Sequence, residues 1–459
     1  MRLPLNLGDR SSLARQLVAA TLGSATVRIV GMAMTFLIGV QLSRYLGPGG
    51  YGVYGTVMAV VALLLVPAQL GLPQIMTRDI PAAMVERDFT KVKGALIWFT
   101  LFVLFASSAL VTLGIVAFSL LSGEQSALPY AAYYWGLAAV PLFALSSLAA
   151  GVLRGFHRVV SAQFYDALFR PATLACLIFL IGSQTGGLSP ASALALQVVS
   201  ISIALALSIW HIMVCMTAEV RNASVIKRPS GWLASAGPIT GTEIIRALDG
   251  QYSVLLLGLM ATIEDVGLFR VALSAAILFG LPSTLINLVV MPYVAQLNAS
   301  SDQPRLQLLA TSSALAMLAG TLSMTALIYL FGSPLIAFVF GEAFRSAWPV
   351  LVALAIAYSI NAFFGSSATI LNMSGQERMV TIAYLCGLAT GIALSCVLIG
   401  PLGIVGCGVA LMGSEFVKGA ILWRTAFRRM DIDIAATSVI RLRESLRGST
   451  QHKRHSGII

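Results

Sequence analysis

Charged residues are scarce in this sequence, and their scarcity excludes a soluble protein. Only 10% of the 459 residues are Asp, Glu, Lys or Arg, against about 25% in an ordinary soluble domain. Hydrophobic residues make up 58%, and the mean hydropathy is +0.88. A soluble enzyme of this length needs far more polar surface, so the composition indicates a membrane protein that crosses the bilayer several times.

Residues that hold metals or carry out catalysis are also few. The chain has five cysteines and four histidines. His211 precedes Cys215 by four residues, but two ligands do not make a metal site. The sequence has no Gly-rich phosphate-binding motif with its Lys, and only short loops separate the apolar segments. We therefore expect no metal, no cofactor, no catalytic residues and no enzymatic activity.

Long apolar segments account for most of the chain. A spanning helix needs roughly 20 apolar residues. Twelve segments meet this requirement, so the sequence predicts an all-α integral membrane fold with about twelve transmembrane helices. They are 17–43, 51–72, 94–121, 130–152, 163–183, 188–214, 233–260, 266–292, 307–331, 346–371, 379–399 and 403–423.

The basic residues between these segments fix the expected orientation. Of the 29 Lys and Arg residues, 22 fall on the side that carries both termini, two fall on the other side, and five lie within the segments. Cytoplasmic loops are the ones enriched in Lys and Arg, so both termini are expected in the cytoplasm. This asymmetry also explains the net charge of +11 without a nucleic-acid partner.

Two short motifs recur in the same order and suggest an internal repeat. Tyr-Gly-Val-Tyr at 51–54 matches Val-Gly-Leu-Phe at 266–269, and Gly-Phe-His-Arg at 155–158 matches Gly-Gln-Glu-Arg at 375–378. Both pairs occupy equivalent places in a six-plus-six scheme, which predicts two six-helix lobes around a central cavity. The expected parts are a lobe at 1–215, a cytoplasmic linker at 216–232, a lobe at 233–423 and a basic cytoplasmic tail at 424–459.

Arg28 stands near the middle of the first apolar segment. A charge at mid-bilayer costs roughly 2.5–3.5 kcal/mol, so such residues face protein or water and point to function. Thr21, Ser24 and Thr35 lie on the same helical face as Arg28. This stripe predicts the wall of a cavity that binds substrate.

The seventh segment carries three ionisable residues, Glu243, Arg246 and Asp249, at successive i,i+3 steps. They favour a substrate site and a site for a coupling ion over a cluster that only orders the helix. Arg270, nearer the outer face, is a further candidate. It either reaches the interface or pairs with Asp265.

Two other pairs of charges lie inside the segments. Asp166 and Arg170 are spaced i,i+4, and Glu415 and Lys418 are spaced i,i+3. Each pair can neutralise itself, and we expect both to be structural.

Several runs along the chain are similar to motifs of one transporter family. They are Leu-Ser-Arg-Tyr-Leu-Gly-Pro-Gly-Gly-Tyr-Gly-Val-Tyr at 42–54, Leu-Gly-Leu at 70–72, Arg-Asp-Ile at 78–80, Leu-Arg-Gly at 153–155, Glu-Asp-Val-Gly-Leu-Phe at 264–269, Phe-Gly-Glu-Ala-Phe at 340–344 and Gly-Pro-Leu-Gly-Ile-Val-Gly at 400–406. In order and spacing the chain resembles the Wzx-type polysaccharide flippases of O-antigen and exopolysaccharide assembly. Their superfamily also contains multidrug and toxin extruders and the lipid II flippase.

The resemblance implies movement of an undecaprenyl-pyrophosphate-linked oligosaccharide from the inner to the outer leaflet of a bacterial inner membrane, for lipopolysaccharide or exopolysaccharide. Cations in the cavity would bind the pyrophosphate. Arg28 fits this role, and Arg246 and Arg270 fit by position. Glu243 and Asp249 depart from a purely cationic cavity and suggest H+ or Na+ coupling. Implied partners are the lipid-linked oligosaccharide, membrane lipids, a polysaccharide polymerase and a chain-length regulator.

Two other functions compete with this interpretation. A multidrug extruder of the same superfamily would carry organic cations in an acidic cavity, whereas the segments here hold four acidic and five basic residues. A membrane-embedded glycosyltransferase would need a larger outer loop or a metal-binding carboxylate cluster. The balance of charges favours an anionic substrate.

Overall fold

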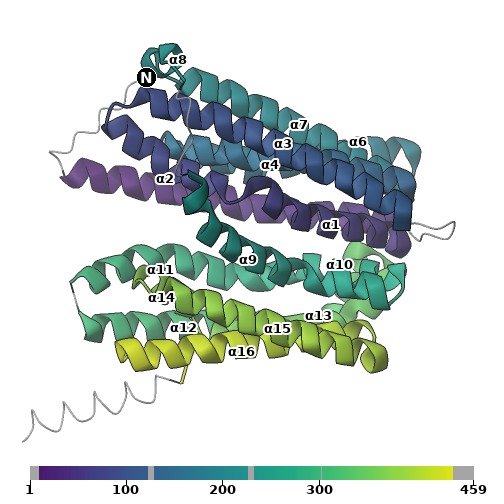
Figure 1. Ribbon diagram of the computed structural model, residues 1–459. Helices are drawn as coiled ribbons and strands as arrows, with labels where there is room; N and C mark the ends of the chain where they lie inside the picture. The colour runs from purple at the N-terminus through teal and green to yellow at the C-terminus, as the bar shows by residue number, and fades with distance from the viewer. Residues whose placement is uncertain (1–9, 122–128, 226–231, 301, 438–459) are drawn as a thin grey trace, which may run out of the picture. The chain divides into compact units, whose positions relative to one another are not determined.

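The computed structural model describes residues 10–121, 129–225, 232–300 and 302–437, and every regular element among them is helical (Figure 1). The α-helices are α1 (Arg10–Gln69), α2 (Leu72–Val85), α3 (Phe89–Leu121), α4 (Tyr130–Gly155), α5 (Val159–Gln163), α6 (Arg170–Thr185), α7 (Pro190–Cys215), α8 (Ala218–Asn222), α9 (Trp232–Met260), α10 (Ile263–Ala276), α11 (Leu281–Ala299), α12 (Gln303–Phe340), α13 (Trp348–Phe363), α14 (Ser367–Met373), α15 (Glu377–Leu402) and α16 (Ile404–Met430). A π-helical turn, η1 (Phe164–Phe169), joins α5 to α6, and two 3-10 turns are η2 (Ile277–Gly280) and η3 (Glu342–Ala347).

The described helices account for all twelve predicted spans. Ten helical stretches are long and apolar enough to cross a membrane. One of them, Gly23–Gln69, contains two spans that run together across a kink. The more polar α9, with 29 residues, supplies one more. The prediction of an all-α integral membrane fold is confirmed.

The kink in α1 lies at Gly47, between the first two predicted spans. Gly47 has φ 66° and ψ −179°, a conformation that favours glycine because it has no Cβ atom. Pro48 follows, and its fixed φ suits the first position of a helix. The second half of α1 therefore begins at residue 48 and not at residue 51, and it ends at Gln69, before the predicted limit of 72.

A helix that the sequence analysis did not predict, α2, lies between the second and third spans. It buries Leu72, Ile75 and Ile80 on one face, as an amphipathic helix does.

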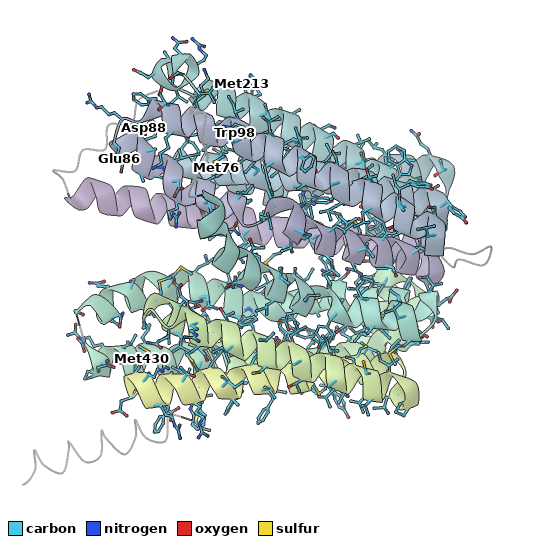
Figure 2. All side chains as sticks on the ribbon, in the orientation of Figure 1. Met76, Glu86, Asp88, Trp98, Met213 and Met430 are labelled. Carbon is cyan, nitrogen blue, oxygen red and sulfur yellow. The ribbon has the colours of Figure 1, made fainter. Side chains whose placement is uncertain are left out.

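The turn after α2 contains Glu86 and Asp88 (Figure 2). Asp88 directly precedes α3 and caps its N-terminus. Its Oδ1 accepts hydrogen bonds from the Thr90 hydroxyl (2.6 Å) and the Lys91 amide (3.0 Å). The bond from Thr90, followed by that from Lys91, lowers the pKa of the Asp88 carboxyl.

The chain forms two compact units, which we call the first and second units. The first comprises residues 1–274 and 339–344, and the second comprises residues 275–338 and 345–459. The lobe limits of 1–215 and 233–423 stay a prediction. Part of the expected linker, 226–231, and most of the expected tail, 438–459, lie outside the described residues. Large apolar side chains, among them Phe105, Leu259 and Phe338, are more than three-quarters exposed, as expected for surfaces that face lipid.

In the second unit, a short segment after α16 returns to the core. Ile432 and Ile434 are fully buried in a cluster of apolar side chains from α11, α12, α14, α15 and α16. Gln307 of α12 holds the backbone of Asp433 at two points, through its Nε2 (2.6 Å) and its Oε1 (2.8 Å). The Trp423 ring nitrogen donates to the Asp433 carboxylate (2.9 Å). The first residues of the predicted tail are therefore part of the folded unit.

Candidate functional site

All five residues predicted to form the site, Arg28, Glu243, Arg246, Asp249 and Arg270, belong to the first unit. They come from three helices. Arg28 lies on α1, the next three lie on α9, and Arg270 lies on α10. Helix α9 packs along α1, and Gly258 of α9 lies beside Thr56. The fold therefore gathers α1 with α9 and α10 in one unit, although five helices of the chain that are longer than ten residues lie between α1 and α9.

Arg28 lies on an exposed face of α1, and among the residues that the structure describes its guanidinium has no carboxylate partner. The Thr35 hydroxyl, on the same stripe, donates to the carbonyl of Gly31 one turn below (2.9 Å). Ser24 is half-buried. The side chain of Thr21 lies outside the described residues. Arg28 therefore keeps its hydrogen-bond donors available for an anion.

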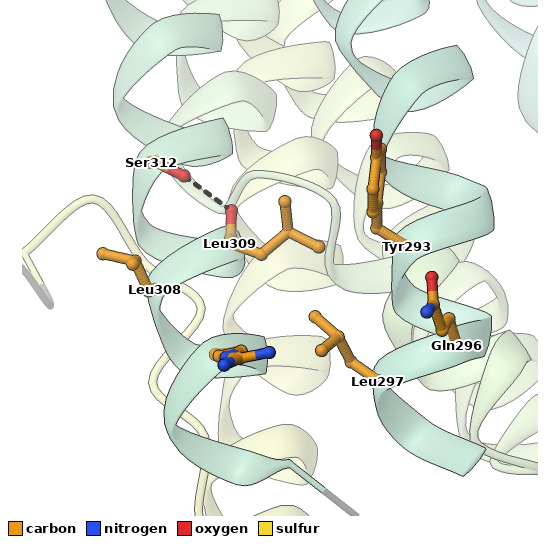
Figure 3. Close-up of a pocket in the computed structure, with 7 residues that line it drawn as sticks. Tyr293, Gln296, Leu297, Leu308, Leu309 and Ser312 are labelled. Carbon is orange, nitrogen blue, oxygen red and sulfur yellow. Dashed lines mark hydrogen bonds between the residues drawn. The ribbon is translucent and has the colours of Figure 1, made fainter. Parts of the chain in front are cut away.

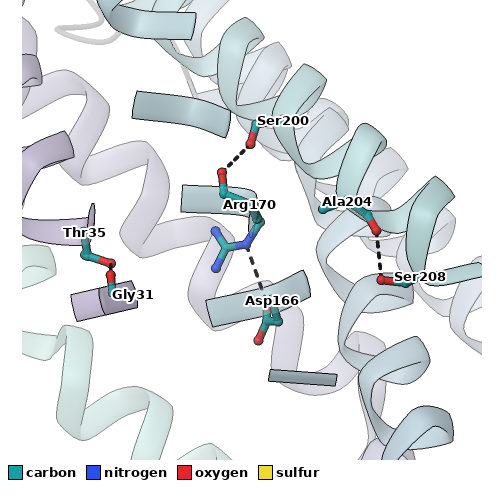
Figure 4. A network of polar contacts seen from close by, with 7 residues as sticks. All are labelled: Gly31, Thr35, Asp166, Arg170, Ser200, Ala204 and Ser208. Atoms are coloured by element: carbon teal, nitrogen blue, oxygen red, sulfur yellow. Dashed lines mark hydrogen bonds and ion pairs between the residues drawn. The ribbon is translucent and has the colours of Figure 1, made fainter. Parts of the chain in front are cut away.

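The face of α1 next to this stripe packs against the π-helical turn. A Cβ atom on Gly31 would overlap the carbonyl oxygen of Ala167, so the two backbones touch. This close approach places Asp166 and Arg170 beside α1 (Figure 4). Segments of π-helix inside α-helices frequently mark functional sites.

The predicted pair of Asp166 and Arg170 forms, but it is loose. Arg170 Nε is 3.5 Å from Asp166 Oδ1, and the guanidinium lies over the Phe143 ring, 5.1 Å from its centroid. The backbone carbonyl of Arg170 accepts a hydrogen bond from Ser200 of α7 (2.7 Å). Arg170 is thus a second cation in the first unit, at the start of α6, which packs against α1. Sequence reasoning set it aside because a carboxylate stands four residues away.

Glu243, Arg246 and Asp249 follow one another along one side of α9. The two acids are half-buried and Arg246 is exposed. The helix therefore carries acidic groups into the same unit as Arg28. This placement is compatible with an ion-coupling role, which stays a prediction.

Arg270 is tied to the backbone of α1 and not to Asp265. Its guanidinium donates to the carbonyl of Gly55 (2.5 Å). The Asp265 carboxylate instead accepts from the Thr262 hydroxyl (2.8 Å) at the start of α10. Of the two alternatives for Arg270, pairing with Asp265 is wrong, because the side chain reaches across to the neighbouring helix.

The crossing of α1 and α10 also explains the repeated motif. A Cβ atom on Gly52 would overlap the Ile263 carbonyl, and one on Gly267 would overlap the Pro48 carbonyl. Each glycine therefore contacts the other helix at the residue four positions before the other glycine. The two copies of the repeated motif, 51–54 and 266–269, therefore pack against each other at this crossing.

Two tyrosines of the repeated motif hold polar partners in the same region. Tyr51 shares a hydrogen bond with Ser274 of α10 (2.9 Å), and Tyr54 donates to Gln197 of α7 (3.2 Å). Sequence reasoning used these tyrosines only to align the repeat. Their alternation with Gly52 was the available signal that this face of α1 is both closely packed and polar.

Other parts of the described chain contain weaker candidates for a functional site. No group of three or more His, Cys, Asp or Glu residues within them could hold a metal ion. An open pocket in the second unit lies between α11 and α12 (Figure 3) and contains none of the predicted site residues. Its lining is formed by Tyr293, Gln296, Leu297, Arg305, Leu308, Leu309 and Ser312. Arg305 there pairs with Asp302 (3.3 Å), so the pocket does not gain a free cation from it.

The sequence matches the model of a protein family described as polysaccharide biosynthesis protein, over residues 17–298. A curated relative is the probable low-salt glycan biosynthesis flippase Agl15 of Haloferax volcanii. It is 23% identical over 394 residues, which cover 83% of this chain and 77% of the relative. The resemblance to polysaccharide exporters is confirmed.

Solved transporters share the fold at low sequence identity. An inward-facing multidrug resistance MATE family transporter of the MOP superfamily has a TM-score of 0.72 at 14% identity, covering 90% of this chain and 98% of its own. The lipid II flippase MurJ, in an inward closed conformation, has a TM-score of 0.69 at 13% identity, covering 89% and 87%. A MOP superfamily transporter from Pyrococcus furiosus, whose binding pocket has reversed polarity, has a TM-score of 0.64 at 14% identity, covering 90% and 95%.

These structures confirm a two-lobe transporter fold of about twelve helices. The relatives are flippases and transporters, in agreement with the expectation that this chain is not an enzyme.

Proposed function

Because the chain belongs to the polysaccharide biosynthesis protein family, we propose that it is a flippase for a lipid-linked oligosaccharide. Its substrate is an undecaprenyl-pyrophosphate-linked repeat unit, which it moves from the cytoplasmic to the periplasmic leaflet of a bacterial inner membrane for lipopolysaccharide or exopolysaccharide assembly. The relatives named as a glycan biosynthesis flippase and a lipid II flippase support this class of substrate.

The observation that carries the proposal is Arg28. It is exposed, it lies within a spanning helix, and no carboxylate among the described residues neutralises it. Facing hydrocarbon would cost roughly 2.5–3.5 kcal/mol, so the side chain favours a water-filled path. A guanidinium offers two parallel hydrogen bonds to pyrophosphate oxygens. The lipid tail stays in the bilayer while the polar head passes along this path.

Arg246 and Arg270 are proposed as further contacts to the anionic head. Arg246 is exposed on α9, whereas Arg270 would first have to release the Gly55 carbonyl. Glu243 and Asp249 on α9 are proposed to bind a coupling H+ or Na+. The membrane potential supplies a further driving force, about 2.3 kcal/mol per charge per 100 mV, because the head is anionic and moves outward.

The proposal includes the surroundings of the protein. Both termini are placed in the cytoplasm, on the evidence of the basic loops. On the periplasmic side, a polysaccharide polymerase and a chain-length regulator would receive the transported unit.

Purified protein in liposomes tests the proposal. A fluorescent undecaprenyl-pyrophosphate-linked oligosaccharide is placed in both leaflets, and a sugar-oxidising reagent that cannot cross the bilayer reports how much is accessible from outside over time. Protein-dependent exchange between leaflets is expected. If the protein instead expels a fluorescent organic cation and leaves the glycolipid in place, it is a multidrug extruder.

A further inference from the structure

A buried ion pair stands near the middle of α16, in the second unit. Lys418 Nζ lies 2.5 Å from Glu415 Oε1, and the side chains are 7% and 20% exposed. Glu415 is eleven residues into the helix, about 16 Å from its first residue at 1.5 Å per residue. The pair therefore lies deep in a helix long enough to span the membrane.

Neighbouring helices contribute a specific partner to each member of the pair. Asn361 of α13 donates from its Nδ2 to the second carboxylate oxygen of Glu415 (2.9 Å). Lys418 Nζ lies over the ring of Tyr384 of α15, 5.4 Å from its centroid. Gly387 of α15 leaves room for the stem of Lys418, because a Cβ atom there would overlap it.

These partners suit the pair with one more proton as well as without it. An amide side chain has both a donor and an acceptor, so Asn361 can bond a carboxylate and, after rotation, a carboxylic acid. The face of an aromatic ring attracts a cation, so Tyr384 continues to stabilise the Lys418 ammonium when Glu415 is neutral.

Access to the pair is one-sided. Asn361 is exposed and Glu415 is partly exposed, whereas Lys418 is buried. Two tyrosines also face the pair: the ring of Tyr384 lies against Lys418 Nζ, and Tyr358 of α13 interacts electrostatically with both members. Helix α14, which also packs on α16, has no acidic or basic residue. Glu415 is therefore the more accessible member of the pair, on the side of Asn361.

We propose that Glu415 and Lys418 form a proton-binding site that couples transport to the pH gradient. The proton adds to the Glu415 carboxylate, the hydrogen-bonded ion pair opens, and Lys418 keeps its own proton, so the site gains one positive charge. The site lies in the second unit and is separate from the acids of α9. With the proton bound here, the ion left for Glu243 and Asp249 is Na+. The inference rests on the transport activity proposed above.

Liposomes with an imposed pH difference and a fixed membrane potential test the site, with the same fluorescent glycolipid as the probe. Exchange of one proton per substrate shifts the steady-state distribution of probe between leaflets about tenfold per pH unit, because one pH unit and a tenfold ratio are the same free energy. Wild-type protein is expected to show this slope, and Glu415→Gln/Lys418→Gln is expected to show none.

The double variant is the informative one. Each single variant leaves one buried charge without its partner and is expected to reduce folded protein, whereas the double variant leaves no uncompensated buried charge. A matched control in the same unit is Asp302→Asn/Arg305→Gln, a more exposed i,i+3 pair at the start of α12, which should keep the wild-type slope.

Three results would overturn the inference. A double variant with the wild-type slope would show that the pair is structural. Loss of the slope in Glu243→Gln/Asp249→Asn alone would place the coupling on α9. Wild-type transport that ignores the pH gradient would remove proton coupling altogether and leave the proposed flippase function intact.

Discussion

Replacement of Arg28 by alanine is the most direct test of the candidate substrate site. The side chain is exposed and has no carboxylate partner in the part of the chain that the structure describes, so its loss should leave the fold intact, within about 0.5 kcal/mol as for other surface substitutions. Binding of the head group should suffer more. One hydrogen bond to a charged group contributes about 1.5–3 kcal/mol, which is roughly 10- to 150-fold in affinity.

Two further variants separate charge from geometry. Arg28→Lys keeps the positive charge but loses the planar fork of donors, so it should retain part of the activity. Arg158→Ala removes an exposed cation from the same unit at the start of α5 and serves as the matched control. The measurement is the rate of glycolipid exchange in liposomes at several probe concentrations, normalised to inserted protein, together with the thermal unfolding midpoint of each variant.

We expect the apparent affinity to fall in Arg28→Ala, to fall less in Arg28→Lys and to be unchanged in Arg158→Ala, with similar unfolding midpoints for all. Wild-type transport by Arg28→Ala would refute the assignment. A large drop in its unfolding midpoint would show that Arg28 stabilises α1 and is not reserved for binding a ligand.

The other predictions concern packing, coupling and pH. Gly52→Ala should destabilise the protein by about 1–3 kcal/mol, because the added methyl group overlaps a backbone carbonyl, whereas Gly250→Ala, which meets open space, should be tolerated in the same thermal assay. If Glu243 or Asp249 binds the coupling ion, neutralising it should remove the dependence of transport on an ion gradient while the protein still inserts, and an unchanged dependence in both variants would leave these acids a structural role. Asp88→Ala should cost about 1 kcal/mol of stability at neutral pH through loss of the helix cap. Since hydrogen bonds lower the pKa of Asp88, this contribution is complete above the unfolded value of about 3.9 and disappears as the pH falls through the folded value, so wild type and variant should converge in acid unfolding curves.

The sequence was sufficient for the spans because their signal is strong and local. Apolar runs of roughly 20 residues and the bias of Lys and Arg toward one side do not depend on tertiary contacts. The break in α1 was also expected, because residues 44–50 separate the first two apolar runs. What failed were boundaries and small elements. Helix α2 is short and amphipathic, and the segment at 431–437 is held against the core by contacts with Gln307 and Trp423 that no local pattern reveals.

The candidate site was predictable only in part. Charges inside spans identified Arg28 and the three residues of α9 directly. The partner of Arg270 was not predictable, because it is a backbone carbonyl 215 residues away. Likewise, an i,i+3 pair such as Glu415 and Lys418 looks the same in sequence whether its surroundings are inert or include an amide and an aromatic ring from other helices.

The energy that the membrane potential supplies divides between the charge of the substrate head group and the charge of the proton bound at Glu415, and this division can be measured. The substrate head carries two negative charges outward, and a proton bound at Glu415 and carried inward adds a third charge in the same electrical direction. Each charge that crosses contributes about 2.3 kcal/mol per 100 mV. A potential of 100 mV should therefore shift the free energy of the probe distribution by about 6.9 kcal/mol in the wild type and by about 4.6 kcal/mol in Glu415→Gln/Lys418→Gln. The difference is roughly 50-fold in the leaflet ratio per 100 mV. With the potential set by potassium and valinomycin at equal pH on both sides, the variant should therefore still transport outward, but less steeply. An identical voltage response in the two proteins would mean that no proton moves through this pair, and a variant that loses its voltage response entirely would mean that the charge of the head group is not what the potential acts on.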